Sequence, residues 1–401
     1  MKKSGLILWV IICALLLSAA PKKNPEIIYL TYTEDPTTSI TVQWHSPIAD
    51  TASMVSYRKK GDSVWLDAEG NSIRPEAYEM LIHRVDLRHL EPNTFYEFRV
   101  GSFKKTNLFR TLSLGVKENP IQFVVGGDAY RFLSSFRKAN RQIAQLDPDF
   151  VVVGGDIAYT HSNKVPFKGK QWEIKRWTTF FSEWKRSMVG KGGRMIPIVP
   201  VVGNHDVPKN QIDPRKTPVL LYQLFAFKKE NVSFRALDIG STLSLILLDT
   251  DHSYPIVGDQ TQWLKETLSD RSNIPYKFAV YHVGAYPSVY PYNGGIPKRI
   301  RKYWCPLFEE GGVQVAFEHH NHAYKRTFPI KDEQIDSKGV IYMGDGCWGV
   351  KPRKPHPRAW YLAAKDRKNC FNFVCLTVEG CDITAYAING EVIDKAPRIT
   401  K

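Results

Sequence analysis

Between Ile27 and about Leu112, short segments of the chain alternate apolar and polar residues. The alternating apolar positions are Ile40, Val42, Trp44, Val55, Tyr57, Tyr96, Phe98 and Val100. Successive side chains of a β-strand point to opposite faces, so this alternation predicts strands with one buried face. We expect residues 24–114 to form a small β-sandwich, with Trp44 as a structural residue of its core.

After a linker from Gly115 to Pro120, the pattern changes to uninterrupted apolar runs that end in polar loops. Such runs are typical of strands buried on both faces. They are Ile121–Val125, Phe150–Val153, Ile196–Val202, Leu245–Leu248, Lys277–Tyr281, Val313–Phe317 and Val340–Met343. Helix-capable segments separate the first three, so we expect an α/β domain over residues 120–392 and a tail over residues 393–401.

One of these helix candidates, Glu173–Ser187, carries four aromatic residues on a single face. They are Trp177, Phe180, Phe181 and Trp184. A stripe of this kind at helical spacing is far more often core than ligand site, so we assign it no chemistry.

The first 20 residues have the pattern of a secretory signal peptide. Lys2 and Lys3 precede an apolar run from Leu6 to Leu17, and small residues follow at Ser18–Ala20. The alternative is an uncleaved anchor, but the run is shorter than the roughly 20 residues that span a bilayer. We expect cleavage, no membrane span in the mature chain, and a secreted, periplasmic or extracellular protein.

Export also bears on the charge and the cysteines. The formal net charge of +15 favours anionic substrates, or loose attachment to an acidic surface, and the basic residues lack the pattern of a nucleic-acid-binding module. An oxidising compartment permits a disulfide, which we expect among Cys370, Cys375 and Cys381.

Polar residues follow five of the apolar runs. Gly-Gly-Asp128 follows the first, Gly-Gly-Asp156 with Tyr159 the second, and Gly-Asn204-His205-Asp206 the third; His282 follows a later run, and His320 and His322 the next. Because the carboxyl ends of the strands of an α/β sheet share one rim, these side chains can meet there. Carboxylates, imidazoles and an amide oxygen suit metal ions, and two such ions clamp a phosphate ester for hydrolysis.

These blocks resemble the motifs of the purple acid phosphatase family of metallophosphoesterases: GDxG, GDxxY, GNH followed by Glu or Asp, VxxH and GHxH. Two further matches are His322-Ala-Tyr-Lys-Arg326-Thr327, which is similar to the family's HAYERT, and the helix around Gln262–Leu264. Leu90-Glu-Pro-Asn-Thr-Phe-Tyr96 resembles the tyrosine corner of fibronectin type III domains. The resemblance implies a fibronectin III-like sandwich followed by a two-sheet αββα metallophosphoesterase domain.

The resemblance also implies a ligand set. It assigns Asp128, Tyr159 and His322 to one metal, and Asn204, His282 and His320 to the other. Asp156 would bridge the two metals, and His205 would face the substrate as the catalytic acid. Iron(III) is expected at the site with the phenolate, and zinc, manganese or iron(II) at the second site.

Three positions depart from the motifs without removing a ligand. Tyr130 and His319 stand where the family has glycine, and Ala279 stands for the valine of VxxH. Tyr130 and His319 are expected to add bulk beside the metals. The loop after His282, from Tyr286 to Tyr292, lacks a second substrate-facing histidine found in plant members.

The sequence thus predicts an exported phosphohydrolase that cleaves phosphomonoesters with a hydroxide held by the two metals. A phosphodiesterase or pyrophosphatase on the same scaffold is the alternative within enzymes. A non-catalytic surface protein, whose metals only stabilise the fold, is the alternative outside them; an intact ligand set together with His205 argues against it.

Overall fold

The computed structural model describes residues 25–161, 169–208, 219–227, 232–344 and 346–400. The predicted signal peptide, residues 1–20, lies outside this range. Within the described residues, none of the helices combines the length and the apolar character that crossing a membrane requires.

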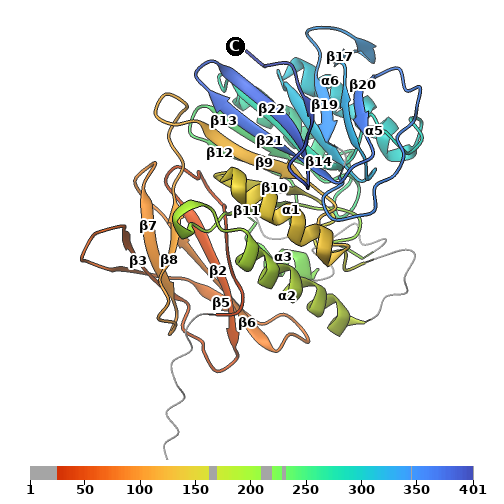
Figure 1. Cartoon of the computed structure of the whole chain (residues 1–401). Helices are drawn as coiled ribbons and strands as arrows, with labels where there is room; N and C mark the ends of the chain where they lie inside the picture. Colours follow the sequence, from red (N-terminus) through yellow and green to blue (C-terminus); the bar gives the residue numbers. More distant parts are fainter. Residues whose placement is uncertain (1–24, 162–168, 209–218, 228–231, 345, 401) are drawn as a thin grey trace, which may run out of the picture.

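The N-terminal part is a sandwich of two four-stranded antiparallel sheets, as the alternating pattern predicts (Figure 1). One sheet has the order β1 (Ile28–Thr31), β2 (Ile40–Pro47), β6 (Met80–Leu87) and β5 (Asn71–Ile73); the other has β4 (Leu66–Glu69), β3 (Met54–Lys59), β7 (Phe95–Val100) and β8 (Asn107–Arg110). The tyrosine corner is confirmed, because the Tyr96 hydroxyl accepts a hydrogen bond from the Glu91 amide at 2.9 Å. Trp44 is fully buried, as expected.

Two larger mixed sheets form the rest of the chain. The first has the order β11 (Ile198–Val201), β10 (Phe150–Gly154), β9 (Ile121–Gly126), β21 (Cys370–Thr377), β22 (Gly380–Ala387) and β23 (Val392–Lys395). The second has β12 (Arg235–Ile239), β13 (Leu243–Leu247), β14 (Tyr276–Val283), β15 (Val315–His319), β19 (Ile341–Gly344), β16 (Tyr324–Thr327) and β20 (Leu362–Asp366). A small hairpin, β17 (Ile330–Lys331) with β18 (Gln334–Ile335), stands apart. All seven predicted apolar runs lie in these two sheets.

The two sheets face each other and helices cover their outer faces. On β9, Phe123 and Val125 belong to the core between the sheets, whereas Val124 packs outward with the helices. The outer helices on the first sheet are α1 (Leu133–Leu146) and α2 (Lys170–Ser187); those on the second are α4 (Asp259–Asp270), α5 (Gly295–Tyr303) and α6 (Cys305–Glu310). The short helices are η1 (Lys191–Gly193) and α3 (Leu220–Leu224). This is the expected αββα arrangement, and the aromatic stripe of α2 lies in its core.

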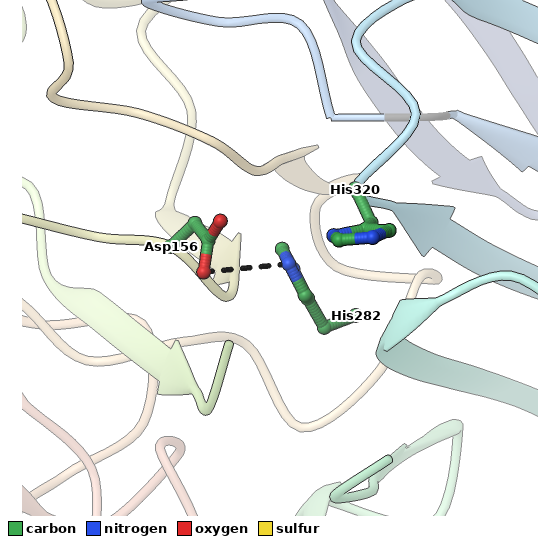
Figure 2. Close-up of side chains that lie close together, drawn as sticks. All are labelled: Asp156, His282 and His320. Atoms are coloured by element: carbon green, nitrogen blue, oxygen red, sulfur yellow. Dashed lines mark ion pairs between the residues drawn. The ribbon is translucent and has the colours of Figure 1, made fainter. Parts of the chain in front are cut away.

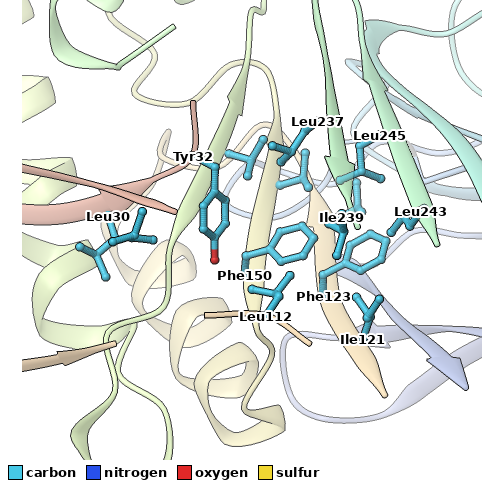
Figure 3. Packing of buried hydrophobic residues seen from close by; sticks show 14 of the residues in the cluster. Leu30, Tyr32, Leu112, Ile121, Phe123, Phe150, Leu237, Ile239, Leu243 and Leu245 are labelled. Carbon is cyan, nitrogen blue, oxygen red and sulfur yellow. The ribbon is translucent and has the colours of Figure 1, made fainter. Parts of the chain in front are cut away.

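The sandwich and the αββα part share one apolar core (Figure 3). Tyr32 of the segment after β1 meets Phe150 of β10 edge to face, with ring centroids 6.0 Å apart. Leu112 and Leu237 belong to the same cluster of buried side chains. The two parts are therefore joined by packing as well as by the chain.

The expected disulfide among the late cysteines is wrong: Cys375 and Cys381 carry free thiols. The register of β21 with β22 pairs Cys375 with Asp382 and Leu376 with Cys381. Paired residues point to the same face and successive residues to opposite faces, so the two thiols lie on opposite faces of the sheet. Residues 392–399, expected to lie mostly in a tail, pair with β22 as β23 and through a bridge between Ile399 and Cys381.

Candidate metal centre

The polar residues that follow the buried strands converge at one rim of the two facing sheets. Strands β9, β10 and β11 run parallel in the first sheet, and β14 and β15 run parallel in the second. Their carboxyl ends therefore point the same way within each sheet. The structure brings all seven predicted ligands into two groups of contacting side chains at this rim.

The first group is Asp128, Tyr159 and His322. The Tyr159 hydroxyl donates to Oδ1 of Asp128 at 2.6 Å and lies 3.2 Å from Nε2 of His322. Nε2 of His322 is 2.8 Å from the same carboxylate oxygen. These three side chains present a carboxylate, a phenol and an imidazole toward one point, which is a donor set for a hard, highly charged cation.

The second group contains Asp156, Asn204, His282 and His320, and Figure 2 shows Asp156, His282 and His320. Nε2 of His282 lies 3.4 Å from Oδ1 of Asp156 and 3.1 Å from Oδ1 of Asn204. One potential ligand atom from each of Asp156, His282 and His320 falls within 4.8 Å of the others. Nδ1 of His282 approaches the Gly154 carbonyl at 2.9 Å, which fixes the ring orientation and leaves Nε2 toward the group.

The two groups are tied to each other through their backbones. The amide of Ala129, next to Asp128, donates to the carbonyl of Asp156 at 3.0 Å. The amide of His320, in the second group, donates to Oδ2 of Asp128 at 2.9 Å. Two hydrogen bonds therefore hold the predicted ligands of the two groups next to each other.

The fit of the second group to a cation rests on atoms that the protein itself leaves unsatisfied. Oδ2 of Asp156 and Nδ1 of His320 are buried and have no hydrogen-bond partner among the described residues. A buried carboxylate oxygen without a partner is costly, and a cation at that point would satisfy it. Oxygen and imidazole donors suit zinc, manganese or iron, so the residues present fit a pair of metal ions.

The charges in the second group are those of a metal-free site: burial would lower the pKa of His282, but Asp156 outweighs it and raises this pKa to about 10, so a bound metal would displace a proton from this ring. Burial alone would raise the pKa of Asp156, but His282 and His205 outweigh it and hold this pKa well below its ordinary value. Burial and the nearby His282 lower the pKa of His320 to about 3, so this ring stays neutral. An ionised carboxylate and a neutral imidazole are the protonation states that bind metal ions.

Five of the seven predicted ligands have a left-handed backbone. Their φ angles lie between 53° and 74°, at Asp128, Asp156, Tyr159, His320 and His322. This conformation is unfavourable for a residue with a side chain, and it is found more often at functional sites. There it turns a side chain in a direction that a regular strand would not allow. The strand ends thus turn their ligands inward at a cost in backbone energy.

His205 lies next to these groups and is partly exposed, with 19% of its side-chain surface accessible. Its ring stacks on Tyr159 at 4.7 Å between centroids, and its amide donates to Oδ1 of Asp156 at 2.7 Å. Nδ1 contacts the carbonyl of His161, and Nε2 is 3.8 Å from Oδ2 of Asp156. The ring is therefore held at the solvent side of the centre.

The structure adds two positions that the sequence analysis did not assign. Asp206 is buried and accepts hydrogen bonds from the amides of Gly203 and Ile157 at 3.0 and 2.7 Å, so it shapes the loop that carries Asn204. His252 follows β13 and lies 5.6 Å from the His282 ring. Like the predicted ligands, His252 follows the end of a buried strand, so the search for polar residues after apolar runs could have found it.

Two of the three motif departures are accommodated without touching the ligand atoms. The Tyr130 ring packs toward the helices, against Phe136 and under the guanidinium of Arg176 at 3.8 Å. The His319 ring fills the space beside two glycines: a Cβ at Gly154 would lie 1.7 Å from Nε2 of His319. Both nitrogens of His319 are buried without a partner among the described residues.

A buried ion pair supports the loop that follows His282. Lys325 and Glu318 are both fully buried and in contact. Glu318 also accepts hydrogen bonds from the Tyr281 hydroxyl and the Ala285 amide, each at 2.6 Å. Because these partners satisfy both carboxylate oxygens, the pair fixes the path of the chain just after the ligand.

A cavity of about 400 Å³ opens beside the second group. Asn204, His252 and His320 line one side of it, and mostly apolar residues line the other: Val283, Pro287, Tyr290, Pro291, Ile296 and Pro297. This is the size of a small organic ligand.

Comparison with known proteins agrees with this architecture. Residues 25–112 match the family model of the purple acid phosphatase N-terminal domain, and residues 117–324 match that of the calcineurin-like phosphoesterases. Purple acid phosphatase 15 of Arabidopsis thaliana is 24% identical over 290 residues, which cover 66% of this chain and 53% of that protein. Purple acid phosphatase 21 of the same plant is 26% identical over 270 residues, which cover 66% and 58%. The matched region thus spans little more than half the length of these relatives.

Among solved structures, purple acid phosphatase PPD1 from yellow lupin (Lupinus luteus) seeds has the same fold. Its TM-score is 0.74 at 17% identity, over 92% of this chain and 73% of that chain. Both parts of the present chain are included in so wide a match. With the two family models in the same order along the sequence, the chain belongs to the calcineurin-like phosphoesterases, in their purple acid phosphatase family.

Proposed function

We propose that the chain is an exported phosphohydrolase that cleaves phosphomonoesters at a binuclear metal centre. The observation that carries this proposal is the convergence of seven donor side chains at one rim, where the buried Oδ2 of Asp156 has no hydrogen-bond partner among the described residues. Purple acid phosphatases are a binuclear-metal family, so family membership supports the same reading.

In this proposal Asp128, Tyr159 and His322 hold one metal, Asn204, His282 and His320 hold the other, and Asp156 contacts both. Bound metals would supply an activated water and neutralise the charge of the phosphate. The first site, with its phenolate, suits iron(III), and the second suits zinc, manganese or iron(II).

His205 is proposed as the general acid. Its imidazole is partly exposed at the solvent side of the centre and stacks on Tyr159. The seven proposed ligands already provide the donors for both metals. A proton on Nε2 would be available to the departing oxygen of the ester. The His161 carbonyl beside Nδ1 keeps the ring in this orientation.

Export is part of the proposal and rests on the first 20 residues, with their two lysines, apolar run and small residues. Expression of the full chain with an epitope tag, followed by fractionation, tests it. Mature protein lacking the first 20 residues outside the cytoplasm is the expected result.

The test of the catalytic proposal combines metal analysis with phosphate release. The purified mature chain should hold two metal ions per molecule and release phosphate from 4-nitrophenyl phosphate. Asp156→Asn should weaken metal binding by more than the roughly 10- to 100-fold that outer-sphere losses cause, and activity should fall with it. Two bound metals without phosphate release would favour the non-catalytic alternative.

Asp147→Asn is a matched control, since it is the same change outside the predicted ligands. Asp147 pairs with the buried Arg194 at 2.9 Å, so the variant is expected to lose some stability. Its metal content and activity should remain. Equal metal loss in both variants would contradict the role of Asp156.

A phosphodiesterase remains the alternative activity on this scaffold. Rates on 4-nitrophenyl phosphate and bis(4-nitrophenyl) phosphate separate the two, because they share a leaving group. A higher kcat/KM on the diester would replace the monoesterase proposal.

A further inference from the structure

The loop of residues 351–358 joins the rim of the candidate metal centre through three contacts, and the nearby Tyr361 adds a fourth. The Arg353 amide donates to the carbonyl of the ligand His322 at 2.8 Å, and the His356 amide donates to the Ser288 carbonyl at 2.7 Å. Nη1 of Arg353 donates to the Tyr290 hydroxyl at 2.5 Å, and the Tyr361 hydroxyl to the Pro287 carbonyl at 2.6 Å. The loop is therefore fixed to the segment that follows His282.

Tyr290 connects this loop to the centre. Its ring stacks on the ligand His320 with centroids 5.0 Å apart, and the guanidinium of Arg353 lies 5.2 Å from the Tyr290 centroid. Arg353 is thus separated from the ligand His320 by a single aromatic ring. A cationic side chain stands at the mouth of the centre.

The same tyrosine lines two cavities. One is the cavity of about 400 Å³ beside Asn204 and His320. The other, of about 370 Å³, is lined by Tyr290 together with His356, Arg358 and Trp360 among others. A leaving group that extends from the metals past Tyr290 would reach the basic loop.

The loop carries excess positive charge. Lys351, Arg353, Lys354 and Arg358 lie within eight residues, and the sequence from Gly346 to Lys365 contains no Asp or Glu. In the part of the chain that the structure describes, no carboxylate forms an ion pair with any of these four side chains. Guanidinium and ammonium groups without carboxylate partners are ready to bind a phosphate.

We propose that Arg353, Lys354 and Arg358 bind a second phosphate group carried by the leaving group of the substrate. The preferred substrates are therefore phosphate esters with a further phosphate along the same molecule. This inference rests on the proposed phosphoesterase function and specifies its substrate class. Arg353 and its neighbours act in binding, outside the bond-breaking step.

Binding of phosphonates tests the inference without turnover, because their carbon–phosphorus bond is not hydrolysed. Calorimetry on the metal-loaded full chain would compare an alkylphosphonate with alkane bisphosphonates of increasing chain length. A bisphosphonate of suitable length should bind roughly tenfold more tightly than the monophosphonate, since several partly exposed ion pairs contribute modestly each. The gain should decrease as salt is added.

The triple variant Arg353→Gln, Lys354→Gln, Arg358→Gln should lose this preference while it still binds the monophosphonate. The double variant Lys354→Gln, Arg358→Gln keeps the Arg353 contacts to Tyr290 and His322, and should lose part of the preference. Lys60→Gln, Lys104→Gln, Lys117→Gln is the control, because it removes three exposed charges from the sandwich and linker. It should keep the full preference.

Equal affinity for mono- and bisphosphonates in the unmodified chain would overturn the inference. A preference for the bisphosphonate that survives in the triple variant would also overturn it. The same holds if the control variant loses this preference as much as the triple variant does. Release of phosphate from 4-nitrophenyl phosphate is measured on the same preparations. Its absence would overturn the proposed function itself, so the two failures are distinguishable.

Discussion

Asn204 and His205 are adjacent in the chain, but their side chains have different neighbours. Asn204 points to the ligand His282, whereas His205 stacks on Tyr159 and remains partly exposed. Because the Asn204 side chain contacts His282 in the second group, the adjacent His205 side chain lies on the solvent side of the groups. That position suits contact with substrate better than ligation.

His205→Ala should therefore retain both metals and lose turnover selectively. An alkyl phosphate has a basic leaving oxygen that needs a proton, whereas 4-nitrophenolate departs as a stabilised anion. We expect a loss of roughly 10² to 10⁴ in kcat on alkyl phosphates and a much smaller loss on the nitrophenyl ester. Steady-state kinetics with metal analysis would measure both, and equal losses in fully metallated protein would contradict the general-acid role.

Tyr159 allows a spectroscopic prediction. In the metal-free chain, burial and the adjacent Asp128 raise the pKa of this phenol well above its ordinary value, so only a bound cation displaces its proton. Protein loaded with iron(III) should show a visible phenolate charge-transfer band that Tyr159→Phe lacks. Tyr290→Phe is the control, since that ring stacks on His320 without belonging to the ligand set. A band that persists in Tyr159→Phe would remove the phenolate from the iron site.

At the scale of single residues, sequence reasoning predicted which side chains lie together where residue type and strand position agree. Asp128, Asp156 and His282 each follow a buried apolar run, and this placement alone predicts that they meet. The buried pair of Glu318 and Lys325 could not be predicted in this way, because its importance depends on the amide of Ala285 and the Tyr281 hydroxyl around it. Such a contact is set by tertiary packing.

At the scale of elements, alternation predicted the sandwich, and the apolar runs marked seven strands of the two larger sheets within a few residues, whereas β12, β16, β20, β21, β22 and β23 were not predicted. The cysteines show the limit of this approach. Export and short spacing favoured a bond, but the register of β21 with β22 places Cys375 and Cys381 on opposite faces. Register depends on which residues pair across strands, and spacing along one strand does not supply it.

Strand β2 contains a buried histidine with a consequence for acid stability. His45 is enclosed by Tyr29, Tyr78 and Phe181, and its Nδ1 is 2.6 Å from the Tyr78 hydroxyl. Burial, with the nearby His83, lowers the pKa of His45 to about 3 from 6.5. The unfolded chain therefore takes up a proton near pH 6.5 that the folded chain refuses until about pH 3, and stability is lost as pH falls through this interval.

His45→Gln should keep a hydrogen bond to Tyr78 and remove one titrating group. Urea unfolding between pH 4 and pH 7 should show a shallower acid limb, by up to about 1.4 kcal/mol per pH unit for one proton. His89→Gln is the matched control, because His89 is exposed in the same sandwich. An unchanged slope in His45→Gln would mean that this ring takes up its proton at the same pH in the folded chain as in the unfolded chain.

At the scale of the molecule, the sandwich is attached to the αββα part along a broad contact. Gln43 of β2 bonds the backbone of Leu224 and Ala226 at 3.1 and 3.2 Å, and Arg84 of β6 donates to the Phe225 carbonyl at 3.0 Å. Arg110 at the end of β8 pairs with Asp149 just before β10. Since β10 leads into Asp156, the sandwich supports a strand that ends in the candidate metal centre, and every proposed ligand lies outside the sandwich.

This shared packing predicts how the chain responds to being divided. A fragment of residues 119–401 contains every proposed ligand, but it would lose the sandwich side of the shared cluster, including the contact of Tyr32 with Phe150. We expect this fragment to aggregate alone and to become soluble when it is produced together with residues 25–114 as a separate chain. Copurification, metal content and phosphate release would measure the recovery.

The intact chain offers the complementary measurement. Two parts that share a core should unfold together, so calorimetry should show a single transition for the full protein, and Tyr32→Ala should lower its midpoint as a whole. The loss at Tyr32, a buried aromatic in contact with Phe150, is expected at about 3–5 kcal/mol. Two outcomes would contradict this: a separate unfolding transition for the sandwich, or a 119–401 fragment that is soluble and as heat-stable as the full chain. Either would mean that the two parts fold independently and that their contact only joins two folded domains.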